Sequence, residues 1–96
     1  ITVNPGLISA ANSILSVSSA SVSSGSSVTL TLTARDINNN NLTTGGSTVL
    51  FTRSGGTSTG SISGTTDNAN GTYTATFTGI VSGSATTINA TIDGNV

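Results

Sequence analysis

The chain has 96 residues and a net charge of −1, with 5 % of its residues charged. This length suits one domain with a single core, and so little charge gives no electrostatic basis for binding nucleic acid or an anionic membrane. The sequence has no cysteine, which excludes a disulfide, and no apolar run long enough for a membrane helix, so membrane insertion is not expected.

The first dozen residues have the least regular pattern of the chain. Ile1 to Val3 is interpreted as a strand fragment, ended by the turn signal Asn-Pro-Gly at residues 4–6. Residues 9–11 are compatible with a helical turn. We therefore expect residues 1–12 to be a linker or first strand, or the end of a preceding repeat, and residues 13–96 to be the domain. Because the chain starts with Ile rather than Met, we expect an excerpt of a longer protein.

Two strands are expected in the next stretch. Residues 14–22 carry apolar side chains in a Ser-rich setting, which indicates an edge strand that breaks and could switch sheets. A turn is predicted at residues 23–26. From Val28 to Ala34, apolar residues then alternate with polar ones, and this is the clearest strand pattern in the chain.

A long loop and another strand follow. The loop covers residues 36–46 and is rich in Asn. Residues 47–53 are predicted to form a strand in which Val49 and Phe51 point inward and Leu50 lies on the other face. Residues 54–60 are then expected to be flexible, and residues 60–66 to form a short strand around an Ile.

The organising stretch of the chain is a corner followed by a strand. Tyr73, Ala75 and Phe77 alternate with Thr, which predicts a strand with one buried face. The segment from Asp67 to Gly71 offers Asx-turn side chains and a glycine that can take a positive φ, so a tight corner is expected. A Tyr just inside such a corner is typical of the tyrosine corner of immunoglobulin-like (Ig-like) sandwiches, whose hydroxyl bonds to upstream backbone. Ala75 stands where a disulfide-bearing domain has its second Cys. We therefore predict a structural corner locked by Asp67, Gly71 and Tyr73, leading into the penultimate strand.

The last strand is expected over residues 86–93, after a connection at residues 80–84. About seven strands at regular spacing result, with no helix of useful length. The predicted fold class is all-β, an Ig-like two-sheet antiparallel β-sandwich without a disulfide. Its core is expected to consist of Val28, Leu30, Leu32, Phe51, Phe77, Ile88 and Ile92.

Three stretches carry a family resemblance: residues 13–25, residues 28–36 with the adjoining Asn-rich turn, and residues 71–77. They resemble a bacterial immunoglobulin-like domain of the invasin/intimin type, with a weaker similarity to filamin repeats. The sequence departs from the invasin pattern at Asn38 to Asn41, which replaces a turn that usually contains Gly and Pro. The resemblance implies tandem repeats that form an adhesin stalk on bacterial surface proteins, where terminal domains usually do the adhering.

One short motif matches a catalytic pattern. Residues 56–60 read Gly-Thr-Ser-Thr-Gly, which is the letter pattern of a nucleophile elbow around Ser58. That elbow needs a strand before it, a helix after it and a His to activate the Ser, and this chain has no His. A chain so rich in Ser and Gly produces such matches by chance. We therefore expect no catalytic residue and no enzyme activity.

Two acidic positions are candidate metal ligands. Residues 36–40 match the first ligand positions of a calcium loop, but Asn41 replaces the required Gly and Ser47 the required Glu. An Asx-capped turn at Asp36 is the favoured interpretation. Asp93, at the end of the last strand, is a better candidate for a metal shared with a neighbouring domain, although this too is the minor alternative. The prediction is therefore no metal and no cofactor.

Glycosylation and surface patterns add little. The sequons at Asn41, Asn70 and Asn89 are about what chance produces in a chain this rich in Asn, Ser and Thr. The rows of Thr on the two clearest strands are interpreted as solvated β-formers rather than as an ice-binding array.

The sequence therefore predicts a non-catalytic spacer repeat of an extracellular bacterial surface adhesin, which extends a distal binding domain from the cell. The expected partners are neighbouring Ig-like repeats of the same chain, and the isolated domain is expected to be monomeric. The location is expected to be the bacterial cell surface or the secreted fraction. The alternative is a binding module that recognises a ligand or protein through the Asn-rich loop, residues 37–41.

Overall fold

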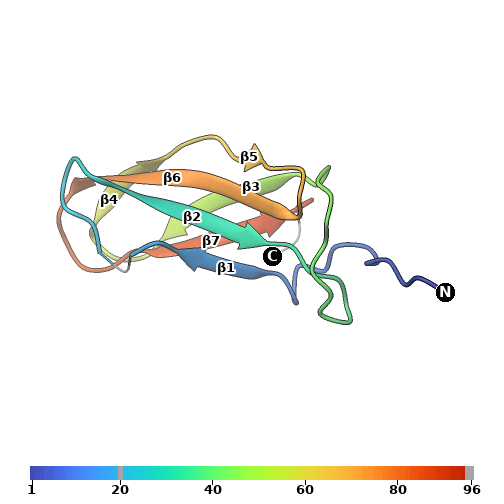
Figure 1. Cartoon of the computed structure of the whole chain (residues 1–96). Coiled ribbons are helices and arrows are strands. Elements are labelled where there is room, and N and C mark those ends of the chain that lie inside the picture. Colours follow the sequence, from blue (N-terminus) through green and yellow to red (C-terminus); the bar gives the residue numbers. More distant parts are fainter. Residues whose placement is uncertain (20, 95–96) are drawn as a thin grey trace.

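The computed structural model describes residues 1–19 and 21–94. Its strands form two antiparallel sheets that pack face to face, which confirms the predicted β-sandwich (Figure 1). The molecule is elongated, with extents of 53 × 21 × 20 Å. The described residues include no helix of a length and apolarity that would cross a membrane. The seven strands are β1 (Ile14–Val17), β2 (Ser27–Thr33), β3 (Val49–Ser54), β4 (Thr59–Ile62), β5 (Thr66–Asp67), β6 (Thr72–Val81) and β7 (Thr87–Ile92).

The larger sheet has five strands in the order β1-β2-β6-β4, with β5 also paired to β6. Its centre is the β2–β6 pair, in which Leu30 lies opposite Ala75 and Leu32 lies opposite Tyr73. All four side chains are buried. Because alternate residues of a strand point to opposite faces, the intervening Thr residues lie on the outer face. The strand patterns predicted for this part of the chain are confirmed.

The smaller sheet contains β3 and β7 only, among the described residues. Val49 and Phe51 are buried and Leu50 is 59 % exposed, so the predicted faces of β3 are confirmed. Across the sheet, Val49 lies opposite Ile92 and Phe51 lies opposite Ala90.

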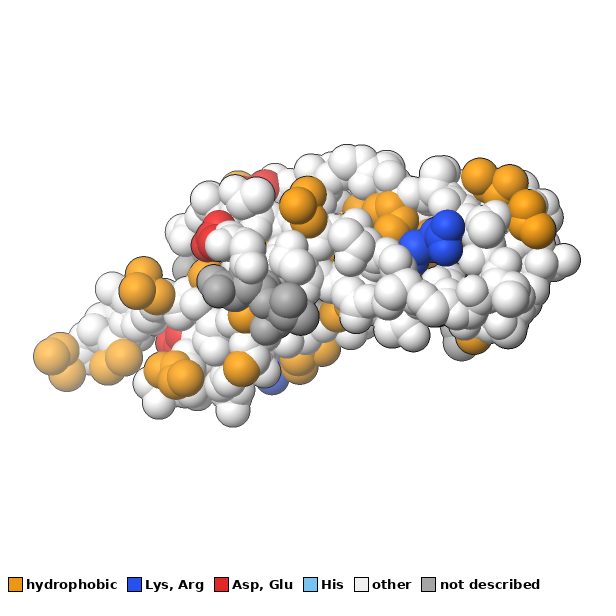
Figure 2. All heavy atoms as spheres, turned by 180° about the vertical axis from the view of Figure 1, so that it is seen from behind, with side chains coloured by type: hydrophobic (Ala, Val, Ile, Leu, Met, Phe, Trp, Pro, Cys, Tyr) orange, Lys and Arg blue, Asp and Glu red, His pale blue; other side chains and the backbone are white. Residues whose placement is uncertain are grey.

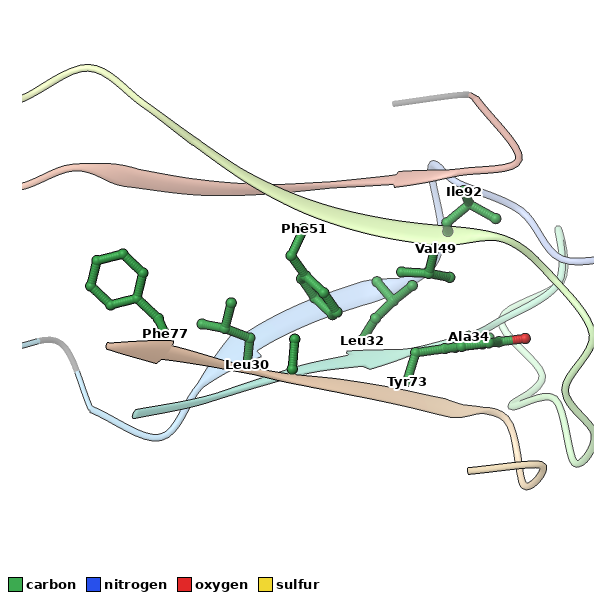
Figure 3. Close-up of a cluster of buried hydrophobic side chains, with 9 residues drawn as sticks. Leu30, Leu32, Ala34, Val49, Phe51, Tyr73, Phe77 and Ile92 are labelled. Atoms are coloured by element: carbon green, nitrogen blue, oxygen red, sulfur yellow. The ribbon is translucent and has the colours of Figure 1, made fainter. Parts of the chain in front are cut away.

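The core lies between the two sheets (Figure 3). Five of the predicted core side chains are buried, and Val28 and Ile88 are half-buried against them. Fully burying one such large apolar side chain is worth about 1.5–3 kcal/mol. The buried set is Leu30, Leu32, Ala34, Val49, Phe51, Tyr73, Ala75, Phe77 and Ile92.

The position of β6 in the sandwich differs from the one its Tyr suggested. In Ig domains the strand with the tyrosine corner lies in the sheet opposite the second strand, and a disulfide joins the two across the core. Here β6 pairs directly with β2, so Ala75 faces Leu30 within one sheet. Assigning Tyr73 to an Ig-type tyrosine corner was therefore wrong in this respect. The strand is nevertheless the penultimate one of the seven described.

Three predictions about where strands lie were also wrong. Ile1 to Val3 forms no strand, and in Figure 1 this segment reaches away from the sandwich. The single strand expected at residues 60–66 is divided into β4 and β5, which pair with different parts of β6. Ile80 and Val81 belong to β6 rather than to the connection after it, because Thr59 of β4 pairs with Val81.

The edge strand β1 is shorter than expected. It ends at Val17, and the described residues between it and the turn at residues 23–26 add no strand in the other sheet. The predicted change of sheets is therefore not seen there, and position 20 lies outside the described residues. The turn itself is confirmed by the hydrogen bond from Ser26 N–H to the Ser23 carbonyl, 2.9 Å.

The residues before β1 close one end of the sandwich. The Ser13 N–H donates to the Ser9 carbonyl at 3.0 Å, which gives a single turn at the place where the sequence is compatible with a helical one. Ile8 and Ala10 pack against the core, and the Ser9 N–H donates to the Arg35 carbonyl at 2.7 Å. This part of the first dozen residues is thus attached to the domain.

Candidate functional site

The predicted corner lies between β5 and β6, at the end of the sandwich where the N-terminal segment enters (Figure 1). Asp67 uses both carboxylate oxygens: Oδ1 accepts the Ala69 N–H at 2.9 Å, and Oδ2 accepts the Gly46 N–H at 2.8 Å. The first bond closes an Asx-turn, and the second reaches the loop that precedes β3.

Gly71 makes the closest backbone approach of the corner. Its φ is 89°, in the left-handed region that favours glycine. A Cβ at this position would overlap the carbonyl oxygen of Leu42. The Gly71 carbonyl in turn accepts the N–H of Ala34 at 2.8 Å, which ties the corner to the end of β2.

Tyr73 spans the core from the larger sheet. Its side chain is 1 % exposed, and its hydroxyl accepts the N–H of Ser47 at 3.2 Å. Ser47 lies 26 residues upstream, in the loop before β3, and not within the corner itself. Asp67, Gly71 and Tyr73 therefore all contact the segment from Leu42 to Ser47, which carries the chain from one sheet to the other. That these contacts lock the corner remains a prediction.

Asp36 is the buried polar residue of the core region, with 3 % of its surface exposed. Its Oδ1 accepts the N–H groups of Asn38 and Asn40, both at 2.9 Å. Its Oδ2 accepts the Gly6 N–H at 2.9 Å and the Asn40 side-chain amide at 3.0 Å. The Asx-turn interpretation of this residue is confirmed. Gly6 adds a contact to the N-terminal segment.

The same donors change the acidity of Asp36. The Gly6 backbone N–H has the largest effect, followed by the side chain and the backbone N–H of Asn40. Because these donors favour the ionised carboxylate, they lower the pKa of Asp36 to about 2 from an ordinary value of 3.8, although burial opposes the change.

The Asn-rich loop is exposed but tied to its neighbours. Asn39 takes a φ of 65°, and its side-chain oxygen accepts the Asn12 side-chain amide at 3.0 Å. The side-chain oxygen of Asn41 accepts a hydrogen bond from Nε of the Arg35 guanidinium at 3.0 Å. At the tip of the loop, Ile37 is 73 % exposed and the Asn38 side chain is exposed. These two side chains are the ones the loop presents to solvent without a hydrogen bond in the described structure.

Asp93 lies at the end of β7 and caps the smaller sheet. Its N–H donates to the Thr48 carbonyl, and its Oδ1 accepts the Thr48 N–H, both at 2.7 Å. Within residues 1–19 and 21–94, no group of three or more His, Cys, Asp or Glu side chains is arranged to hold a metal ion.

The nucleophile-elbow pattern does not adopt the geometry of an elbow. Residues 55–58 join β3 to β4, and the last two residues of the motif belong to β4, so a strand stands where the elbow requires a helix. The Ser58 hydroxyl donates to the Ser84 carbonyl at 2.6 Å. This serine therefore connects two loops at the end of the sandwich opposite the corner.

Comparison with known proteins identifies the type of domain. Residues 9–96 match the model of the family described as invasin, domain 3. The chain belongs to the invasin domain 3 family. This confirms the resemblance to invasin/intimin-type domains, and with it the Ig-like sandwich.

This invasin-type domain also resembles a solved structure, FdeC, described as a broadly conserved Escherichia coli adhesin. The TM-score is 0.77 and the sequence identity is 26 %. The match covers 99 % of this chain and 30 % of the FdeC chain, so the invasin-type domain spans less than a third of that structure. The search of curated proteins gives no significant match. The domain is thus an adhesin-associated Ig-like domain.

Sequence reasoning missed the partners that the N-terminal segment supplies to this invasin-type domain. Gly6 donates to Asp36, and Asn12 donates to the Ile37 carbonyl at 3.0 Å. These pairs are separated by 30 and 25 residues. The turn signal at residues 4–6 marked a fixed backbone, but nothing local in the sequence indicated which residue it would contact.

Proposed function

We propose that this domain is a non-catalytic spacer repeat of an extracellular bacterial surface adhesin, which extends a distal binding domain from the cell. The observation that carries the proposal is the FdeC match, in which nearly the whole chain superimposes on only 30 % of an adhesin chain. A spacer contributes length and stiffness, whereas binding needs specific side chains on positioned loops.

The surface of the domain supports a spacer role. Figure 2 shows a face made mostly of uncharged polar groups and backbone, with few charged side chains. The elongated shape, 53 Å in its longest extent, suits a unit that adds reach. We propose neighbouring Ig-like repeats of the same chain as its partners, a location at the cell surface or in the secreted fraction, and a monomeric state for the isolated domain.

The boundary of the repeat belongs to the same proposal. We place the domain at residues 13–96 and residues 1–12 as its linker, with the end of a preceding repeat as the alternative for residues 1–12. The hydrogen bonds of Gly6 and Ser9 to Asp36 and Arg35 support a linker held against the domain rather than a free tether.

A replacement experiment in the parent adhesin tests the spacer function. Exchanging this domain for an unrelated sandwich of equal length should leave adhesion intact, while deleting it should shorten the reach without abolishing binding. Adhesion is measured with cells or beads held at increasing distance from the target surface. Loss of adhesion on exchange at equal length would contradict the spacer function.

The second candidate is a binding module, favoured by the exposed tip of the Asn-rich loop. The double variant Ile37→Ser/Asn38→Ser changes the two exposed loop side chains that make no hydrogen bond in the described structure. It leaves the Asp36 contacts in place, because Asn38 contributes only its backbone to them. The control is Ser61→Ala, at an exposed position on β4 in the larger sheet. Loss of adhesion in the loop variant alone, with an unchanged circular dichroism spectrum, would favour the binding module over the spacer.

A further inference from the structure

The corner between β5 and β6 contains a reactive pair of residues. Asn70 is followed by Gly71, and no other Asn of the chain precedes a Gly. The main-chain nitrogen that follows an Asn can attack the side-chain carbon Cγ and close a succinimide ring with it. A glycine in the following position leaves that nitrogen accessible, because it has no Cβ. The Asn70 side chain is exposed, so water also reaches the site.

Hydrogen bonds hold the Asn70 side chain over the peptide that follows it. Its Oδ1 accepts the N–H of Thr72 at 3.1 Å and the hydroxyl of Thr72 at 2.6 Å. The bond from the N–H closes an Asx-turn, in which the side chain folds back along its own backbone. The Cγ atom of Asn70 is thereby kept beside the Gly71 nitrogen, and less conformational freedom has to be lost when the two atoms react.

Thr72 directs two donors at the atom on which charge develops. When a nitrogen adds to Cγ, the side-chain oxygen becomes an oxyanion, and fixed donors that point at such an oxygen lower the barrier. Thr72 is itself held by Asn68, whose N–H donates to the Thr72 carbonyl at 3.1 Å and whose side-chain amide donates to Thr72 Oγ1 at 3.2 Å. Because Oγ1 accepts from Asn68, the hydroxyl proton is directed at Asn70.

The attacking nitrogen makes no competing hydrogen bond. In the described structure the Gly71 N–H donates to no acceptor, and Gly71 belongs to no strand. Asn68 shows the contrast two residues earlier. The amide that follows it, that of Ala69, donates to Asp67 Oδ1 at 2.9 Å, and Ala69 carries a Cβ. The two neighbouring Asn residues therefore differ in whether the next nitrogen can react.

We propose that Asn70 is a site of spontaneous deamidation that the folded corner promotes. The Gly71 nitrogen gives up its proton to solvent and forms a bond to Cγ of Asn70. Both donors of Thr72 stabilise the resulting oxyanion at Oδ1. When this intermediate collapses, the bond from Cγ to the side-chain nitrogen breaks, and that nitrogen takes up a proton and leaves as ammonia. The succinimide ring remains.

Water then opens the ring, and no other reactant is consumed. Cleavage of the new bond between the Gly71 nitrogen and Cγ gives an aspartate side chain, whereas cleavage of the original peptide bond gives isoaspartate. Either product adds one negative charge to the corner that already contains Asp67. Isoaspartate also lengthens the main chain directly before Gly71, which lies against the Leu42 carbonyl.

Peptide mapping of the folded chain tests the site. The purified chain is incubated at mildly alkaline pH, where the amide loses its proton more readily, and mass spectrometry of its peptides locates each Asn that has become acidic. Conversion at Asn70 should be at least about tenfold faster than at Asn68. The same chain in guanidinium chloride, where Thr72 is no longer held, should convert at Asn70 no faster than the folded chain does.

Two substitutions of Thr72 test its part in the reaction. Thr72→Val removes the hydroxyl and keeps the shape of the side chain, and it should slow the conversion of Asn70 in the folded chain at least about threefold. The matched control, Thr72→Ser, keeps the hydroxyl and should stay within about twofold of the parent rate. In guanidinium chloride the three proteins should convert at equal rates. Circular dichroism checks that both variants are folded.

Faster conversion in guanidinium chloride than in the folded parent chain would overturn the proposal, because the corner would then protect Asn70. That comparison needs no substitution, so it is decisive even where Thr72→Val does not fold. Equal rates in the folded Thr72→Val variant and the parent chain would overturn the proposal too, since the reaction would then depend on the Asn-Gly pair alone. None of these measurements involves adhesion, so the deamidation site and the spacer function stand or fail separately.

Discussion

The two sheets of the domain are built from similar alternating sequences, yet they bury their side chains to different extents. In the larger sheet, Leu30 and Tyr73 are 0 % and 1 % exposed. In the smaller sheet, Ile88 and Ala90 remain half-buried although they point to the same core. Among the described residues, β2 and β6 each have a strand on both sides and β7 has one, and although Ile92 of β7 is buried, its other two inner residues are not fully covered. Alternation decides which face a side chain takes, and the neighbours within and across the sheets decide how far it is buried.

The largest expected effect compares one core residue from each sheet. Leu30→Ala should lower the free energy of unfolding by about 2–5 kcal/mol, because it leaves a cavity in a fully buried site. Ile88→Ala should lower it by about 1–2 kcal/mol, since that side chain is only partly buried. Urea denaturation of the two variants measures the difference. Equal losses would show that both sheets are equally well packed.

The hydroxyl of Tyr73 is the next target, because it joins the larger sheet to the start of the smaller one. Tyr73→Phe should lower the free energy of unfolding by about 1–3 kcal/mol, since the partly buried Ser47 N–H loses its acceptor. Ser47→Ala is the matched control, because it keeps the N–H and should be close to neutral. A change within about 0.3 kcal/mol in Tyr73→Phe would remove the predicted role of this residue in the corner.

Asp36, which follows β2, should make stability depend on pH in the acidic range. Its pKa is lower in the folded domain, about 2 against 3.8, so the folded state favours the ionised form. The stabilisation is therefore present above about pH 4 and is lost as the pH falls from about 4 to about 2. Thermal melts across this range should show a falling midpoint for the parent chain. In the Asp36→Asn variant the midpoint should not show the part of the decrease that Asp36 causes. An identical pH profile in both proteins would contradict the role given to the Asp36 carboxylate.

The smallest expected effect concerns the acidic residues at the ends of the two sheets. The melting temperature should be the same in EDTA and in millimolar calcium, because an ion bound to the folded state would raise it by mass action. A clear rise with calcium would contradict the prediction of no metal. Asp36→Asn and Asp93→Asn would then show which sheet carries the site.

The sequence allowed the strands and their faces to be predicted well where the alternation was long. Val28 to Ala34 and the strand after Gly71 are examples, since a period of two over seven residues leaves one choice of inner face. It did not allow the pairing to be predicted. The Tyr73 strand was placed by analogy with a corner motif, but a local motif does not say which strand lies alongside.

The contacts around the candidate site were predictable only in part. The Asx-turn at Asp36 follows from an Asp with Asn residues two and four positions later. The bond from Gly6 does not, because it depends on the path of the N-terminal segment over the end of the sandwich. The division of the strand at residues 60–66 was missed because β6 is long enough to pair with two short strands in succession.

The attachment of the N-terminal segment has a mechanical consequence. A pull on that segment first loads the bonds from Gly6 to Asp36 and from Ser9 to Arg35, and only then reaches β1. When the opposing force acts at the other end of the sandwich, tension acts along the axis of β1, because β1 begins at the end where the segment leaves. The ladder from Ile14 to Val17 is then loaded in shear, with its bonds strained together rather than opened one after another. The short buried contacts of Asp36 thus stand in series with the edge strand, as a first barrier to extension under force.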